Sequence, residues 1–229
     1  FLGYVLPYGQ MSYWGAQVII SLFGAIPYIG ESLELWVRGD YYISGITVSR
    51  FFALHVVALP LVLIALVFLH LVALHEVGAG NPEGVDIEEH LDEDGVPLDS
   101  VPFFPYKVLN ALVAIGVFMT VFSIIMFFFP EGGGYFIEMA NFQEANPLVT
   151  PDHIAPVWYY APFYTMLRAI PDPLGGLIVM ASAVAIFFIV PWLDRSKVAS
   201  IRYKGIYSKI AITMFGVSFL TLGYLGTVG

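Results

Sequence analysis

Residues 49–77 read SRFFALHVVALPLVLIALVFLHLVALHEV, an apolar run that is long enough to cross a lipid bilayer and that contains three histidines. Ionisable side chains at membrane depth are costly, and they therefore mark candidate functional sites. His55 and His70 are fifteen residues apart, which on a helix separates the two rings by roughly 22 Å. This distance is too long for one shared metal ion, and it suits two separate sites across a hydrocarbon core about 30 Å thick.

The composition is that of an integral membrane protein. The chain is 59% hydrophobic and only 12% charged, and its net charge is −9. Clustered Lys and Arg are needed to neutralise phosphates, so this charge balance argues against nucleic-acid binding. Cysteine is absent, which excludes disulfides, thiolate metal sites and covalent haem attachment through a cysteine pair.

The hydropathy pattern predicts an all-α fold, a polytopic transmembrane helical bundle with about five spans. Helices are expected because every backbone polar group in lipid must be satisfied within the chain. Pro60 predicts a kink or a local widening of the helix that contains it. The expected spans are residues 13–29, which is marginal in length, 47–75, 108–129, 175–193 and 206–224.

The connections between the spans predict how the chain is oriented in the membrane and where it divides into two portions. Residues 80–100 form an acidic loop without Lys or Arg, whereas residues 194–209 hold five of the nine basic residues. The positive-inside rule places the basic loop, and by counting back the acidic loop, in the cytoplasm. The long connection 129–173 then lies on the outer side and is expected to contain short amphipathic helices. We expect a first portion over residues 1–100 and a C-terminal membrane portion over 101–229.

The histidines are open to more than one interpretation. Neutral imidazole suits iron, copper or zinc, and a six-coordinate haem needs a second axial ligand. A partner helix with two further histidines could therefore hold one haem at each level. Histidines in spans also hydrogen-bond to neighbouring helices or line proton paths. His75, beside Glu76 at the membrane edge, is better placed for a small ligand than for a buried metal.

The element Pro-Val-Trp-Tyr-Tyr-Ala-Pro-Phe-Tyr at residues 156–164 is the second notable feature. It contains five aromatic residues and two prolines. Such an element is compatible with an aromatic belt at the membrane interface. It is equally compatible with one wall of an apolar pocket for a flat ring-shaped ligand.

Several motifs, in order along the chain, resemble the cytochrome b family of the quinol–cytochrome c oxidoreductase, respiratory complex III. The sequence style resembles the proteobacterial members. The motifs are GYVLPYGQMSYWGA at residues 3–16, AIPYIG at 25–30, RFFALH at 50–55, HLVALHE at 70–76, NPEG at 81–84, FFPY at 103–106, PVWY at 156–159 and LRAIP at 167–171.

The resemblance implies that His55 and His70 are axial ligands of two b-type haems, the first nearer the outer side and the second nearer the cytoplasm. Their axial partners belong to an earlier helix of the family. We therefore expect the chain to be a partial one that lacks the early helices and the last one and that is not active alone. Arg50 is expected among the cofactor-binding residues.

The resemblance also implies two quinone pockets, one on each side of the membrane. Quinol would be oxidised at the outer pocket and a quinone reduced at the inner one, near His75, with coupled proton translocation. The expected partners are a cytochrome c-type subunit, a Rieske iron–sulfur subunit, a second copy of the complex and the lipid of a bacterial inner membrane, with ubiquinol and ubiquinone as substrates. The outer pocket would be formed by Met11, Gly15, Ile19, Pro156, Val157, Trp158, Tyr159 and Phe163.

Three positions depart from the family pattern. Val157 stands where most members have a Glu that is thought to accept a quinol proton, and Tyr159, Tyr160 or water would have to replace it. The spacing of fifteen between the haem histidines is one more than is usual. Lys107 and Asn110 occupy the stretch where an Asp is often found at the inner pocket.

Two functions of other classes remain as alternatives. A proton-coupled secondary transporter would also place histidines in its spans, although the expected inverted repeat is not visible in the five spans. A cofactor-free scaffold that packs against other subunits is the third hypothesis.

Overall fold

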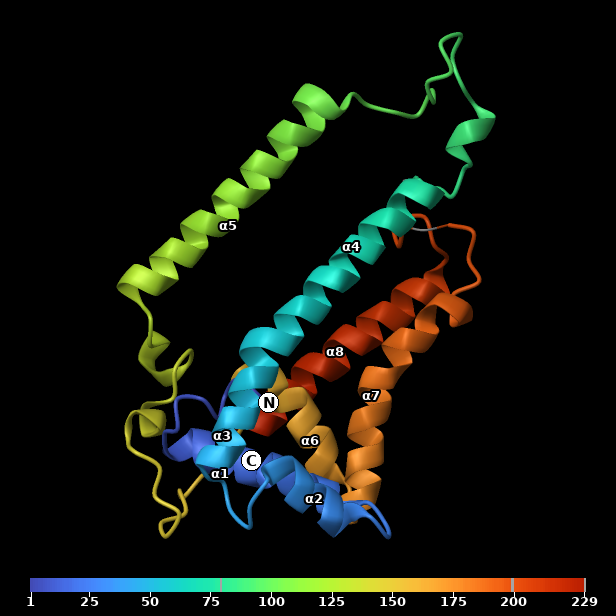
Figure 1. The fold of residues 1–229 in the computed structure, drawn as a ribbon. Coiled ribbons are helices and arrows are strands. Elements are labelled where there is room, and N and C mark those ends of the chain that lie inside the picture. The colour runs from blue at the N-terminus through green and yellow to red at the C-terminus, as the bar shows by residue number, and fades with distance from the viewer. Residues whose placement is uncertain (79, 199, 229) are drawn as a thin grey trace. The chain divides into compact units, whose positions relative to one another are not determined.

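The computed structural model of the chain describes residues 1–78, 80–198 and 200–228 (Figure 1). These residues form helices and connecting loops, and among them no strand is found, only two isolated bridges. The all-α prediction is therefore confirmed. The contacts divide the chain into two units, which are described separately: residues 1–75, 138–194 and 214–228 form the first, and residues 76–137 and 195–213 form the second.

The histidine-bearing segment is one continuous helix of 33 residues, Gly45–Val77. It consists of α3 (Gly45–Phe52), the π-helical turn η2 (Ala53–Ala58) and α4 (Leu59–Val77). A proline has no N–H, and its ring clashes with the carbonyl one turn earlier. Pro60 predicts a local widening of the helix, and the π turn that ends at Ala58, two residues before it, is this widening.

Three more helices are long and apolar enough to span a membrane. Each contains at least 21 residues, which corresponds to about 30 Å of helix. Most of their large apolar side chains are exposed on the protein surface, as expected for side chains that face lipid. These helices are α5 (Val108–Phe128), which follows the π turn η4 (Phe103–Lys107), α7 (Pro173–Leu193) and α8 (Ile206–Val228).

The expected span over residues 13–29 is wrong, so the part of the chain that the structure describes has four candidate spans and not five. This region forms α1 (Gln10–Ser21), the short helix η1 (Leu22–Ala25) and, after a turn, α2 (Gly30–Arg38). The 12 residues of α1 reach only about 18 Å. Its apolar residues face the protein interior and not lipid: Met11, Tyr13, Ala16 and Ile20 are buried.

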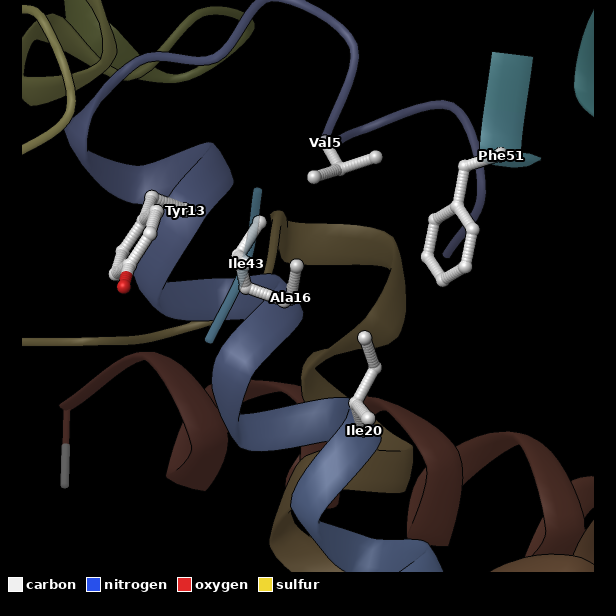
Figure 2. Packing of buried hydrophobic residues seen from close by; sticks show 6 residues of the cluster. All are labelled: Val5, Tyr13, Ala16, Ile20, Ile43 and Phe51. Atoms are coloured by element: carbon white, nitrogen blue, oxygen red, sulfur yellow. The ribbon is translucent and has the colours of Figure 1, made fainter. Parts of the chain in front are cut away.

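The buried core of the first unit lies around α1 (Figure 2). Figure 2 shows side chains from α1, from the preceding loop, from the turn before α3 and from α3 itself directed towards one another. Ala16 at the centre is small enough for these segments to approach closely. The core residues are Val5, Tyr13, Ala16, Ile20, Ile43 and Phe51.

The long outer connection contains the short helices that were expected. They are η5 (Gly132–Gly134), η6 (Met139–Phe142), η7 (Trp158–Tyr160) and α6 (Ala161–Ala169). Glycines allow α6 to pack closely on its two neighbours (Figure 1). A Cβ atom on Gly176 of α7 would collide with the Leu167 carbonyl, and one on Gly226 of α8 would collide with the Ala161 carbonyl.

In the second unit, side chains order the backbone of the acidic loop. The Asn81 side chain accepts hydrogen bonds from the N–H groups of Glu83, Gly84 and Val85 at 2.8–3.1 Å. A short helix, η3 (Ile87–Glu89), follows. The Ser200 N–H donates to the Pro82 carbonyl at 3.0 Å, so the acidic and basic loops are hydrogen-bonded to each other.

The start of α3 gives a test of the fold. Thr47 is fully buried; its hydroxyl accepts from the Ser44 N–H at 3.1 Å and donates to the Arg38 carbonyl at 2.6 Å. Thr47→Val leaves the half-buried Ser44 N–H and the carbonyl of the buried Arg38 without this partner, so we expect it to lower the free energy of unfolding by about 1–3 kcal/mol. Denaturant unfolding in detergent micelles measures this change. The control is Thr213→Val, because the exposed Thr213 donates to a carbonyl one turn back on its own helix.

Candidate functional site

His55 and His70 lie on the same helix and differ in their surroundings. His55 belongs to the π turn η2, and its ring lies against the backbone of the N-terminal loop. A Cβ atom on Gly3 would come within 2.7 Å of Cε1 and Nε2 of His55, so a larger residue at position 3 would displace the His55 ring. His70 is exposed on the surface of α4. Within the described residues, neither ring has a hydrogen bond, and both histidines are exposed.

The π turn changes the angular relation between the two rings. Fifteen residues of regular α-helix at about 100° each leave an offset of about 60°, whereas fourteen leave about 40°. A π turn closes its hydrogen bonds at i+5, so it takes one extra residue without a full α-helical rotation. With the π turn Ala53–Ala58, two histidines fifteen residues apart have nearly the angular relation of histidines fourteen residues apart on a regular α-helix.

His75 differs from the other two. Its Nδ1 lies 2.7 Å from the Leu71 carbonyl oxygen. A carbonyl only accepts hydrogen bonds, so Nδ1 carries the proton and Nε2 is left as an acceptor. His75 is thus oriented to bind a small hydrogen-bonding ligand.

Arg50 is placed at the junction of α2 and α3. Its Nη1 donates to the Trp36 carbonyl at 2.9 Å, and its guanidinium covers Gly39, which has φ +78°. A guanidinium carries five N–H donors. This bond therefore leaves other donors for an anionic group.

Met11, Gly15 and Ile19, three of the residues predicted to form the outer pocket, all lie on α1. Met11 is buried, Ile19 is 37% exposed, and a Cβ atom on Gly15 would lie 3.7 Å from the Tyr4 ring. The structure therefore places Gly15 under Tyr4, while Met11 points into the protein interior.

Residues 141–149 hold α1 in position through hydrogen bonds. The Ser12 N–H donates to Asn141 Oδ1 at 2.8 Å, and the Gln10 N–H donates to the Gln143 carbonyl at 2.9 Å. Trp14 Nε1 donates to the Asn146 carbonyl at 3.2 Å. The long connection is therefore hydrogen-bonded to α1 at several points.

The second predicted wall is the aromatic element after Pro156. Val157 precedes η7, and its carbonyl accepts from the Tyr160 N–H at 2.8 Å. The rings of Trp158 and Tyr159 meet edge to face at 5.4 Å, and both residues are about half exposed. Phe163, one helical turn later, packs against Phe219 of α8 at 6.1 Å instead.

Two half-buried titratable residues, Tyr4 and Glu138, were not predicted from the sequence. Each influences the pKa of the other. Burial raises the pKa of Tyr4 to about 12, with Glu138 adding to the shift and Tyr159 contributing less. Burial also raises the pKa of Glu138, while His153 and Tyr4 oppose that rise. Five acidic residues occupy the connection 129–173, and no local pattern distinguishes Glu138 from the others.

Two family models together match the whole chain. The model described as cytochrome b(N-terminal)/b6/petB matches residues 1–162, and the one described as cytochrome b(C-terminal)/b6/petD matches residues 144–229. The chain belongs to the cytochrome b/b6 family. The resemblance inferred from the motifs is therefore confirmed.

Individual relatives agree with the family assignment. Over 99% of its length the chain is 53% identical to cytochrome b of Allochromatium vinosum and 47% identical to cytochrome b of Rickettsia bellii, covering 56% and 54% of those proteins. It also matches a chain of a hyperthermophilic respiratory complex III with a TM-score of 0.87 and 33% identity. That match covers 100% of this chain and 58% of the other. The chain thus spans about half the length of the curated relatives it matches.

The influence of Tyr4 on Glu138 can be tested by titration. Tyr4 opposes the rise in the pKa of Glu138, because a hydroxyl that donates to a carboxylate stabilises the charged form. We therefore expect Tyr4→Phe to raise the pKa of Glu138 further above its usual value. Infrared titration of the carboxyl C=O band measures the shift. Tyr28→Phe, at a fully exposed tyrosine, should leave the titration unchanged, and an unshifted band in Tyr4→Phe would contradict the influence of Tyr4.

Proposed function

We propose that the chain acts as the cytochrome b subunit of a respiratory complex III, which oxidises a quinol at an outer site and reduces a quinone at an inner site. The observation that carries this proposal is the pair of open imidazoles, His55 and His70, on one membrane-spanning helix of a cytochrome b/b6 family member. In this function the electrons cross the membrane between two haem levels while protons leave on one side and enter on the other.

The residues on the spanning helix fit two b-type haems. His55 and His70 would each supply one axial imidazole ligand to a haem iron. A b-type haem bound at each histidine would supply single-electron transfer. Gly3 has no side chain and so leaves space for the His55 ring. Arg50 has N–H donors that suit a haem carboxylate.

For the outer site we propose the surface between α1 and the element 156–159. Gly15, the Tyr4 ring above it and the exposed rings of Trp158 and Tyr159 would receive a flat quinol ring. The other residues assigned to this pocket are Met11, Ile19, Pro156, Val157 and Phe163.

For the inner site we propose His75 as the residue that contacts the quinone. Its Nε2 can accept a hydrogen bond from a quinol hydroxyl. After protonation it can donate to a quinone carbonyl. The Leu71 carbonyl orients the ring for both tasks.

The proposed setting follows from the same function. The partners would be a Rieske iron–sulfur subunit, a cytochrome c-type subunit and a second copy of the complex, in a bacterial inner membrane. Ubiquinol and ubiquinone would be the substrates, and the acidic and basic loops would face the cytoplasm. No observation on the structure specifically favours the transporter or the scaffold.

The ligand assignment is tested by replacing each histidine in the full complex. We expect His55→Leu and His70→Leu each to abolish one of two b-type signals in reduced-minus-oxidised spectra, because leucine cannot coordinate iron. His75→Leu is the control and should keep both signals. Two intact signals in His55→Leu would refute the assignment, and a wild-type complex without haem would favour the transporter or scaffold.

The π turn is tested by two single-residue deletions that both shorten the histidine spacing to fourteen. Deleting Val57 converts the π turn into an α turn and keeps the rings on their faces, so both haem signals should remain. Deleting Ile64 from α4 rotates His70 by about 100° relative to His55, and we expect one signal to be lost. Equal spectra of the two deletion variants would contradict the role of the π turn.

A further inference from the structure

Residues 146–149 of the long connection form a β-turn beside α1. The Val149 N–H donates to the Asn146 carbonyl at 3.3 Å, and the Asn146 side chain accepts from the Leu148 N–H at 2.9 Å. Pro147 stands at the second position of the turn, where its fixed φ is favoured. The Asn146 N–H at the start and the Val149 carbonyl at the end are not used within the turn.

The side-chain amide of Gln10 binds both of these free ends. Its Oε1 accepts from the Asn146 N–H at 2.7 Å, and its Nε2 donates to the Val149 carbonyl. A main-chain N–H only donates and a carbonyl only accepts, so the two partners fix which way the amide faces. Gln10 is the first residue of α1 and is only 6% exposed. Its amide therefore attaches the whole turn to the N-terminal end of α1.

The chain that follows the turn has a second fixed point just before the aromatic element 156–159. The Tyr164 hydroxyl of α6 donates to the Ile154 carbonyl at 3.2 Å. Only four residues separate Val149 from Ile154, and one of them is Pro151, whose ring restricts the backbone. The segment that leads into the aromatic element is thus held on α1 through Gln10 and on α6 through Tyr164.

We propose that Gln10 is a positioning residue of the outer quinol site and that its amide sets the position of the element 156–159 relative to α1. This inference rests on the proposed function, in which the quinol ring lies between α1 and this element. Gln10 acts through the 146–149 turn and does not contact the quinol. Errors of about 1 Å in the position of binding groups are enough to lower an enzymatic rate strongly.

Loss of the Gln10 amide should move the turn and leave the fold intact. Asn146 and Val149 are exposed, so water can replace the amide as their hydrogen-bond partner. The Gln10 N–H still donates to the Gln143 carbonyl at 2.9 Å, and the Ser12 N–H still donates to Asn141 Oδ1 at 2.8 Å. These bonds keep the long connection on α1 when the Gln10 side chain is changed.

The central experiment compares Gln10→Leu with Gln143→Leu in the full complex. Gln143 is exposed, and only its main-chain carbonyl bonds to α1, so it is the matched control. We expect Gln10→Leu to lower kcat/KM for quinol by about tenfold, chiefly through a higher KM because a displaced wall weakens quinol binding. Gln143→Leu should keep both constants. A Gln10→Leu complex with reduced haem content but the wild-type KM would show a structural role only and overturn the inference.

Gln10→Glu tests the bond to Val149 by pH, because glutamate has nearly the shape of glutamine. The carboxylate accepts from the Asn146 N–H but has no proton for the Val149 carbonyl, whereas the protonated acid can make both bonds. Activity relative to wild type at the same pH should therefore recover as the pH falls through the pKa of the introduced carboxyl, which burial raises. A ratio that does not change with pH would overturn the inference.

The other titratable groups around this end of α1 do not disturb the comparison. Glu144 lies opposite Gly9 in an isolated backbone bridge, and it is present in both proteins, so its effect cancels in the ratio. Tyr8 and Tyr13 stay protonated at these pH values, because burial raises the pKa of each.

Hydrogen exchange of the wild-type complex covers the case in which Gln10→Leu does not assemble. The Asn146 amide should exchange slowly although Asn146 is exposed, because its N–H is bound by Gln10. Gln10→Glu should lose this protection at high pH relative to wild type. Rapid exchange of the Asn146 amide in the wild type would overturn the inference.

Failure of the inference and failure of the proposed function are distinguishable. A wild-type complex without quinol-dependent cytochrome c reduction would overturn the proposed function, and the role of Gln10 in a quinol site with it. An active complex in which Gln10→Leu keeps the wild-type kcat/KM would overturn only the inference about Gln10.

Discussion

The constraint on which this structure depends is that every backbone polar group at membrane depth must be hydrogen-bonded within the chain. It forces the segment Gly45–Val77 into one continuous helix, so the number of residues between His55 and His70 sets their separation. Pro60 removes one donor from this ladder, and the π turn before it takes up one extra residue. The two proposed haem levels therefore follow from a hydrogen-bonding requirement.

The segments outside the spans fold for a different reason. Around α1, apolar side chains are buried against one another as in a water-soluble protein (Figure 2). Hydrogen bonds from Gln10, Ser12 and Trp14 attach the long connection to this helix. A half-buried carboxylate such as Glu138 can be held in these segments outside the candidate spans, whereas the hydrocarbon region penalises one.

Of the five spans predicted from the sequence, four are confirmed as candidate spans, because length and hydropathy reflect the requirement for lipid contact. Residues 13–29 were predicted wrongly for a physical reason. Tyr13, Ala16 and Ile20 are apolar because they face the protein core, and composition does not distinguish burial in protein from burial in lipid. For the site, the histidines could be named from the sequence because they interrupt an apolar run. Glu138 could not, since it is one of several acidic residues in the connection.

What a reader of the sequence can establish is what depends on local pattern: the helices, their length and the fifteen-residue spacing of His55 and His70. The folded chain was needed to show which distant segments meet. Gly3 lies against the His55 ring, and the Tyr4 ring lies over Gly15. These contacts depend on how α1 packs against the long connection. Periodicity and hydropathy describe each segment separately, and they contain no information about the partner that a segment selects when the whole chain packs.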